Sequence, residues 1–285
     1  MKKSLTAILT SLLMLGSLPV CQAADQALTL PDYVYDVVRQ MIEEEKLSNT
    51  ETIELNHKTW ALTFSDDFDG DTLDDSKWER CPEQERSDLG AYWSDSCSWL
   101  DGEGHLVINV RKQDGRYCSG AIQTQGKFEQ AYGYFEIRCK LQSEPGFWTA
   151  FWLMGDTVGN VGNGSQDGVE IDIMEALKRE DPVIHHNLHW DGYGVHHQTT
   201  GTDVTVPGIF DGYHTFGLEW NEEAYIFYVD GQETWRTTAD GICTAPLFII
   251  ISAEVGTWGG DITQAALPDS MLVDYVKVYQ EVKPV

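Results

Sequence analysis

Residues 169–175 read Val-Glu-Ile-Asp-Ile-Met-Glu and place three acidic side chains inside an apolar run. Successive side chains of a β-strand point to opposite faces, so Glu170 and Asp172 would share one face while the two isoleucines point into a core. Glu175 would then lie on the core face. A β-bulge at residues 173–174 would bury Met174 with the isoleucines and return Glu175 to the face of the other acids. The sequence therefore predicts a bulged strand with one acidic face.

Carboxyl groups this close together indicate glycosidic bond cleavage. That reaction uses two carboxyl groups that flank the bond, about 5–5.5 Å apart when the anomeric configuration is retained and farther apart when it is inverted. Like charges at short range oppose joint ionisation, so one carboxyl should keep a proton while another stays ionised, and Asp172 can tune both. The alternative is a chance cluster on a solvated surface, since the chain has 46 Asp and Glu residues.

Outside this strand, the chain from Trp60 onward consists of short alternating runs separated by Gly, Asp and Asn. Such runs predict an all-β sandwich in a single domain. The clearest of them are Leu106–Val110, Tyr134–Leu141, Tyr225–Val229 and Leu247–Ser252.

The stretch Glu170–Glu175 resembles the E-x-D-x-x-E signature of glycoside hydrolase family 16, the laminarinase and β-glucanase group. The similarity extends over about residues 60–280. Further segments that resemble the family pattern are, in chain order, Phe64–Phe68 with Trp78, Tyr132–Arg138, Gly146–Leu153, Tyr213–Trp220, Tyr228–Gly231, Gly256–Gly260 and Val273–Tyr279. The resemblance implies a concanavalin-A-like jelly roll with an open cleft, which favours attack within polysaccharide chains.

The resemblance also implies roles for the three acids. Glu170 would be the nucleophile, Glu175 the general acid and then base, and Asp172 the assistant of the nucleophile. We expect a retaining endo-glycosidase that hydrolyses β-1,3 or mixed β-1,3/1,4 glucans by double displacement. Galactan hydrolases of the agarase, carrageenase and porphyranase type share the long signature, so that activity and transglycosylation remain alternatives. A carbohydrate-binding lectin-like module is the alternative from another class.

Aromatic side chains near the motifs are candidates for stacking on sugar rings. Trp148, Trp258 and Trp152 lie in or beside matched segments, and Trp152 is the one most suited to core packing. Tyr92 and Trp93 would line an outer subsite or form a surface clasp.

Histidines are densest between residues 185 and 197, where His189 is expected to contact a catalytic carboxyl or sugar hydroxyls and the others to be solvated. Metal ligation by these histidines is not expected. The reaction itself requires no cofactor. By resemblance, Asp274 would help hold a structural calcium ion, although it is equally compatible with a plain exposed acid.

Residues 1–23 have the layout of a secretory signal peptide, with Lys2 and Lys3 before an apolar stretch and small residues at its end. We expect a secreted or periplasmic protein, with a lipid anchor at Cys21 as the weaker alternative. Residues 24–57 form an N-terminal extension with a short amphipathic helix at Pro31–Lys46, and residues 58–285 form the catalytic domain.

The chain carries 19 Lys and Arg against 46 Asp and Glu, a net charge of −27. This charge should repel nucleic acid and anionic membranes and favours a neutral polysaccharide as the partner. We expect a monomer. Five cysteines would follow the leader, an odd number in an oxidising compartment. The expected bridges are Cys118–Cys139, across a hairpin, and Cys81–Cys97, although all five could be reduced.

Overall fold

The computed structural model describes residues 35, 37–41, 45, 48–178 and 181–283, and the chain divides into two compact units, Met1–Ser48 and Asn49–Val285. In the first unit every described residue is helical, which agrees with the predicted helix, and the predicted leader lies outside the described residues. None of the described helical residues belongs to a helix that could cross a membrane. The second unit begins before residue 58 because residues 52–55 pair with the next strand.

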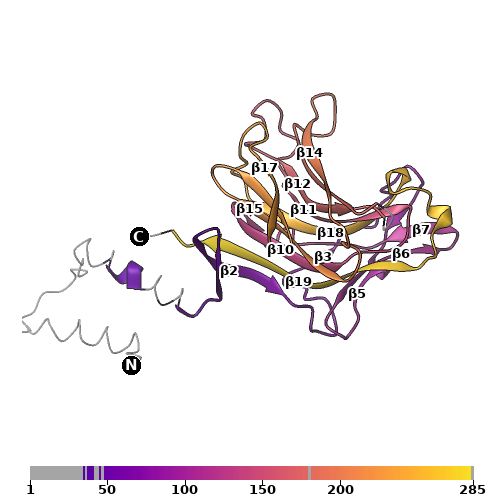
Figure 1. Cartoon of the computed structure of the whole chain (residues 1–285), viewed down its shortest axis with the longest axis horizontal. Helices are drawn as coiled ribbons and strands as arrows, with labels where there is room; N and C mark the ends of the chain where they lie inside the picture. Colours follow the sequence, from indigo (N-terminus) through magenta and orange to yellow (C-terminus); the bar gives the residue numbers. More distant parts are fainter. Residues whose placement is uncertain (1–34, 36, 42–44, 46–47, 179–180, 284–285) are drawn as a thin grey trace, which may run out of the picture. The chain divides into compact units, whose positions relative to one another are not determined.

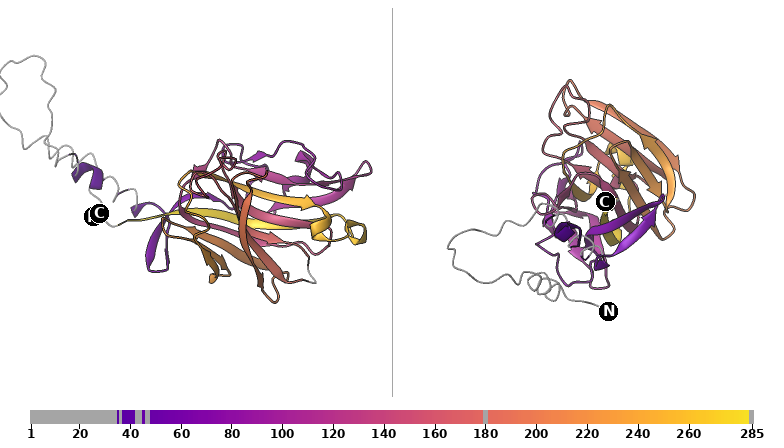
Figure 2. Two further views of the ribbon diagram at one scale, coloured as in Figure 1. Left: turned by 90° about the horizontal axis from the view of Figure 1, so that it is seen from above. Right: turned by 90° about the vertical axis from the view of Figure 1, so that its left-hand side faces the viewer.

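The second unit is a sandwich of two sheets, stacked as curved layers in Figures 1 and 2. The first sheet has 11 strands in the order β17-β16-β15-β10-β19-β6-β7-β4, with β1 and β2 attached beside β19 and β5 beside β6. Its strands are β1 Thr52–Leu55, β2 Lys58–Asp66, β4 Tyr92–Trp93, β5 Ser98–Leu100, β6 Leu106–Gln113, β7 Arg116–Ser119, β10 Gly133–Lys140, β15 Tyr213–Trp220, β16 Tyr225–Val229, β17 Gln232–Thr237 and β19 Asp269–Glu281.

The second sheet has eight strands in the order β14-β13-β12-β11-β18-β8-β3, with β9 beside β18. Its strands are β3 Glu79–Arg80, β8 Ala121–Gln123, β9 Glu129–Gln130, β11 Phe147–Met154, β12 Glu170–Ala176, β13 Val183–Trp190, β14 Gln198–Thr205 and β18 Leu247–Val255. Short 3-10 helices are η1 Asp95–Cys97, η2 Thr257–Gly259 and η3 Ile262–Gln264. All strand pairs are antiparallel among the described residues except β4 with β7. The predicted all-β jelly-roll sandwich is confirmed.

The core lies between the two sheets because alternate residues of each strand turn inward. On β11, Phe147, Phe151 and Leu153 have no exposed surface, and on β12 neither do the isoleucines 171 and 173. The outward residues of the same two strands are left to form the opposite face of the eight-stranded sheet. That face therefore presents the acids of β12.

The predicted β-bulge is present in β12. The register with β13 shifts between Asp172 and Glu175, and the register with β11 shifts between the partners of Met174 and Asp172. Met174 is fully buried, as predicted. His186 was expected to be solvated, but it is buried and its Nδ1 lies 2.7 Å from the carbonyl oxygen of Ile173. The imidazole thus supplies a donor at the bulge, and burial lowers its pKa to about 4, which keeps it neutral.

All five described cysteines are free thiols, so both expected bridges are absent. Cys118 on β7 and Cys139 on β10 do not face each other, because β6 and β19 lie between those strands. The hairpin centred on residue 128 does not form, since the chain crosses to the eight-stranded sheet at β8. Cys81 hydrogen-bonds to β8 through its backbone, whereas Cys97 ends η1 and places its sulfur 3.3 Å from that of Cys118.

Candidate active site

The three acids of β12 line one cavity of about 350 Å³ on the outer face of the eight-stranded sheet. The bulge thus brings Glu175 to the same side as Glu170 and Asp172, as the sequence predicts. Other residues that line this cavity are Arg86, Trp148, Ala150, Trp152, Met154, Tyr193, Ser252 and Glu254. They come from β11, β18, the segment before β4 and the loop between β13 and β14.

Glu170 accepts a hydrogen bond from the hydroxyl of Tyr193, at the tip of the β13–β14 hairpin. Burial raises the pKa of Glu170, while the Tyr193 hydrogen bond and the nearby His189 oppose that rise. A hydroxyl donor favours the ionised form of a carboxyl group. Of the three acids on β12, Glu170 is therefore the carboxyl with the best support for ionisation.

Asp172 is the most buried of the three acids, with 5% of its surface exposed. Burial, and then the charges of Glu170 and Glu254, raise its pKa well above the ordinary value. The Nε2 of His189 lies 3.3 Å from its carboxylate, so the predicted contact of His189 with a catalytic-type carboxyl is present. The other ring nitrogen of His189, Nδ1, lies 3.0 Å from Nε2 of His197. His197 was expected to be solvated, yet it forms the outer end of this chain of contacts.

Glu175 has its pKa raised well above the ordinary value by burial and by the charge of Asp172. Its Oε2 accepts a hydrogen bond of 2.9 Å from the amide of Asn187 on β13, which acts in the opposite direction. Asn187 has room because Gly201 lies opposite it on β14, where a Cβ would fall 2.1 Å from Oδ1 of Asn187. Glu175 is therefore arranged to hold a proton.

Glu254 forms a fourth acidic group in the cavity wall. Burial raises its pKa, and its ion pair with Arg86, 2.7 Å between Nη2 and Oε1, opposes that rise. The Arg86 guanidinium also lies 4.3 Å from the ring centre of Trp93. The only basic side chain lining this cavity in the described structure is thus already paired.

The tryptophans expected to bind sugar occupy different depths. Trp148 lines the cavity, and its ring meets that of Trp258 edge-on with 5.2 Å between centroids. Trp258 is 45% exposed and does not line the cavity itself. Trp152 lines the cavity but is mostly buried, and its indole donates to Ser252 at 3.1 Å. Contact of these rings with substrate stays a prediction.

Trp93 and Tyr92 do not line the cavity. Trp93 is 4% exposed, packs beneath Arg86 and donates its indole N–H to the carbonyl of Ala253 at 3.2 Å. Direct sugar contact by Trp93 is therefore a wrong prediction, because its ring packs in a buried cluster with Ala150 and Trp152. Tyr92 carries the guanidinium of Arg116 over its ring at 4.7 Å, the clasp arrangement, and its outer-subsite role stays a prediction.

One group of three side chains in the described part of the chain could hold a metal ion: Glu170, Asp172 and His189. Two of these are acids of the candidate reaction centre. Asp274 instead forms an ion pair with Arg138, which already neutralises its carboxylate. Among the described residues, Asp274 belongs to no such group of side chains, and calcium binding there stays a prediction.

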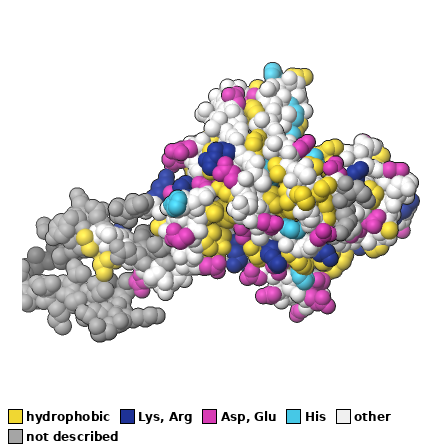
Figure 3. Space-filling view, viewed as in Figure 1, with side chains coloured by type: hydrophobic (Ala, Val, Ile, Leu, Met, Phe, Trp, Pro, Cys, Tyr) yellow, Lys and Arg dark blue, Asp and Glu magenta, His cyan; other side chains and the backbone are white. Residues whose placement is uncertain are grey.

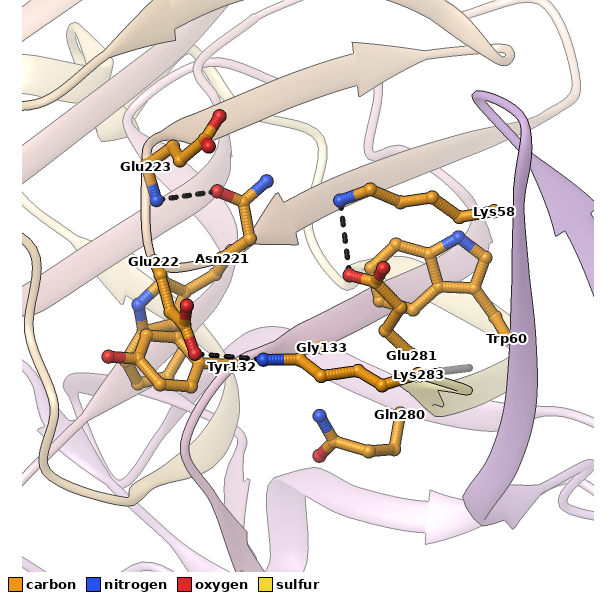
Figure 4. Close-up of a pocket in the computed structure, with 11 residues that line it drawn as sticks. Lys58, Trp60, Tyr132, Gly133, Asn221, Glu222, Glu223, Gln280, Glu281 and Lys283 are labelled. Carbon is orange, nitrogen blue, oxygen red and sulfur yellow. Dashed lines mark hydrogen bonds and ion pairs between the residues drawn. The ribbon is translucent and has the colours of Figure 1, made fainter. Parts of the chain in front are cut away.

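A second cavity, of about 290 Å³, lies on the 11-stranded sheet and is shown in Figure 4. Four of its charged groups form two ion pairs: Lys58 lies 3.1 Å from Glu281, and Lys283 lies 2.8 Å from Glu222. Trp60 in its wall is 1% exposed, so its ring face is not open to a sugar. Two of its three acids, Glu222 and Glu281, are thus held by lysines, an arrangement that suits structural pairing better than catalysis.

Sequence reasoning from one strand did not identify Tyr193, Asn187, Arg86, Glu254 or His197. The only local signal was Gly192-Tyr193-Gly194, an aromatic residue between two glycines in a loop. The other partners come from distant parts of the chain, and Arg86 and Glu254 are separated by 168 positions.

Comparisons of the sequence and of the fold with those of known proteins agree with one another. The model of "Glycosyl hydrolases family 16" matches residues 86–277. The β-glucanase of Rhodothermus marinus is 30% identical over 253 residues, which cover 79% of this chain and 86% of that protein. The glucan endo-1,3-β-glucosidase A1 of Niallia circulans is 30% identical over 267 residues, covering 77% of this chain but only 38% of that protein. The crystal structure of the endo-β-1,3-glucanase of Pyrococcus furiosus superposes with a TM-score of 0.67 at 29% identity, covering 82% of this chain and 99% of the other.

Proposed function

Because the chain belongs to glycosyl hydrolase family 16 and is a glycoside hydrolase, we propose that it cleaves β-1,3 or mixed β-1,3/1,4 glucan internally and with retention of configuration. The observation that carries this proposal is the bulge of β12, which directs Glu170, Asp172 and Glu175 into one cavity lined by aromatic rings. The names of the similar proteins support a β-glucan as the substrate.

In the first step, Glu175 donates its proton to the glycosidic oxygen while Glu170 attacks the anomeric carbon. The bond to the leaving sugar breaks, and a covalent glycosyl ester forms on Glu170. Burial favours the protonated form of Glu175, which suits a proton donor. The Tyr193 hydroxyl favours the ionised form of Glu170, which suits a nucleophile.

In the second step, ionised Glu175 removes a proton from water, and the water oxygen attacks the anomeric carbon. The ester bond to Glu170 breaks, Glu170 leaves as a carboxylate, and Glu175 is protonated again. Asp172, which lies beside Glu170, orients the nucleophile and supports the changing charge; its raised pKa lets it donate a hydrogen bond. No cofactor takes part.

A neutral polymer suits this cavity better than a sulfated one. Arg86 is held by Glu254, and the four acids of the cavity would repel sulfate. On the face shown in Figure 3, acidic and basic side chains are interspersed, without a broad basic surface. The leader-like residues 1–23 and the polymeric substrate support an exported protein, and we propose that it acts as a monomer.

The test measures the release of reducing ends from laminarin and barley mixed-linkage glucan, with agarose and carrageenan as other substrates. Glu170→Gln and Glu175→Gln should each lose about 10²–10⁴-fold or more of the activity. The exposed Glu103→Gln makes the same chemical change outside the cavity and should keep full activity. Full activity in either cavity variant, or binding of glucan without release of reducing ends by the wild type, would refute the proposal.

A second substrate separates the two roles. An aryl β-glucoside with a good leaving group needs little protonation, so Glu175→Gln should still release the aryl group in a burst, whereas Glu170→Gln should not. The first sugar products of the wild type should carry the β configuration at the new reducing end. A burst from Glu170→Gln would reverse the assignment.

A further inference from the structure

Two thiols outside the cavity lie next to each other in the fold. The sulfur atoms of Cys97 and Cys118 are 3.3 Å apart, and both residues are fully buried. No other pair of thiols among the described residues has a comparable contact. The two residues are separated by 21 positions, with Cys97 at the end of η1 and Cys118 on β7.

We infer that Cys97 and Cys118 form a disulfide bond when the chain folds in an oxidising medium. An S–S bond is about 2.05 Å long, so the sulfurs must approach by a little over an ångström to form it. The backbones are already fixed beside each other. Tyr92 pairs with Cys118, Ser94 N–H donates to the carbonyl of Ser119 at 3.0 Å, and Cys97 N–H donates to the carbonyl of Ser94 at 2.9 Å.

The oxidant is a low-molecular-weight disulfide such as oxidised glutathione. One cysteine thiolate attacks it and forms a mixed disulfide, releasing one glutathione thiolate. The second cysteine thiolate attacks the protein sulfur of that mixed disulfide, forms the Cys97–Cys118 bond and releases the second glutathione. The two cysteines lose two electrons and two protons, and the oxidant becomes two thiols.

Burial determines when this exchange takes place. In the folded protein, desolvation and the neighbouring Cys118 raise the pKa of the Cys97 thiol to about 12, so little thiolate is present at neutral pH. The bond should therefore form during folding, before η1 closes over β7. Once formed, it should resist reduction for the same reason, since the sulfurs have no exposed surface.

The bond would fasten one end of the segment that builds a wall of the cavity. That segment, residues 81–97, carries Arg86, whose guanidinium pairs with Glu254, and Trp93, on which the guanidinium packs. At its other end Cys81 N–H donates to the carbonyl of Ala121 at 3.0 Å, and its buried side chain packs in a cluster that includes Trp93. A disulfide at Cys97 would limit local opening of this wall.

Peptide mapping tests the inference directly. The full chain is unfolded with reductant, refolded with oxidised and reduced glutathione, and treated in denaturant with a thiol-blocking reagent before trypsin digestion. Cleavage after Lys and Arg puts each of the six cysteines of the full chain into a different peptide, with Cys97 in 87–111 and Cys118 in 117–127. We expect these two peptides to be linked, with a mass lower by two hydrogens, and the remaining cysteines to be blocked. Blocked thiols at both positions, or linkage of either cysteine to a different peptide, would overturn the inference.

Thermal stability gives a second measurement that does not depend on mapping. A disulfide closing a loop of 21 residues should raise Tm by about 7–13 °C in a domain of this size. The difference in Tm between refolding in oxidised and in reduced buffer should disappear in Cys97→Ala and in Cys118→Ala. The difference in Tm should persist in the matched control Cys243→Ala, because Cys243 does not belong to this pair of thiols. The same difference in all four proteins, or in none of them, would contradict the bond.

Discussion

Replacement of Asp172 by Asn should make the protein more stable and less active. The pKa of Asp172 is raised well above its ordinary value of 3.8 because the group is buried beside Glu170 and Glu254. The folded state therefore favours its neutral form, which Asn resembles in size and in hydrogen bonding. At neutral pH the wild type must keep a proton on Asp172 or accommodate a buried charge, and the variant does neither.

The direction of this pH dependence follows from the difference in proton binding between the folded and the unfolded state. Below about pH 3.8 the acid is protonated in both states and has no effect on the free energy of unfolding. As the pH rises above that value, the unfolded chain ionises first, so wild-type stability falls until the pH reaches the pKa of the folded state. Each unit of raised pKa corresponds to about 1.36 kcal/mol, or about 3–5 °C in Tm for a domain of this size. The Tm of Asp172→Asn should therefore exceed that of the wild type at pH 7, and the gap should be much smaller near pH 4.

Differential scanning calorimetry between pH 4 and pH 8 measures this gap, with activity on laminarin recorded for the same samples. Asp114→Asn is the matched control, because Asp114 is exposed in the turn between β6 and β7 and its left-handed backbone, with φ of 49°, also suits Asn. The reasoning is refuted if the Tm gap of Asp172→Asn is negative or does not change with pH, or if Asp114→Asn shows the same pH-dependent gap.

Two further substitutions test the partners of the glutamates. Tyr193→Phe removes the hydroxyl that lowers the pKa of Glu170, so the acidic limb of the kcat/KM profile should move to higher pH; an unchanged limb would contradict the assignment of Glu170 as the ionised group. Gly201→Ala puts a Cβ 2.1 Å from Oδ1 of Asn187 and 2.7 Å from the carbonyl oxygen of His186. It should lower the free energy of unfolding by about 1–3 kcal/mol, measured by urea denaturation, while disturbing the hydrogen bond to Glu175. Wild-type stability in Gly201→Ala would show that Asn187 can move freely.

Local alternation was enough to predict the sandwich and the acidic face. Runs such as Tyr225–Val229 keep the same bounds in the structure, because a strand of five buried residues between turn residues has few other ways to cover its apolar side chains. The bulge was predictable for a related reason: Met174 is apolar and Glu175 is not, so only an extra residue lets each reach the environment that suits it.

Predictions that depended on how distant strands meet were less successful. The Cys118–Cys139 bridge assumed a hairpin, but β8 belongs to the opposite sheet and the two cysteines end up on strands separated by two others. Trp93 reads as a loop aromatic, yet its ring packs in a buried cluster with Ala150 and Trp152 of β11. Packing between such distant segments leaves no periodic signal in the sequence, because the partner side chains are supplied by the fold as a whole.

The partners of the buried acids explain how four carboxyl groups coexist in one cavity. Each acid has a donor or a basic partner from a different part of the fold; these pairs are Glu170 with Tyr193, Asp172 with His189, Glu175 with Asn187, and Glu254 with Arg86. The partners of the two glutamates on β12 are neutral. A Lys or Arg beside Glu175 would favour its ionised form and remove the proton that the leaving sugar needs. A neutral amide fixes the carboxyl in place and leaves its raised pKa largely intact, so the choice of Asn187 over a cation keeps Glu175 suited to donate a proton near neutral pH.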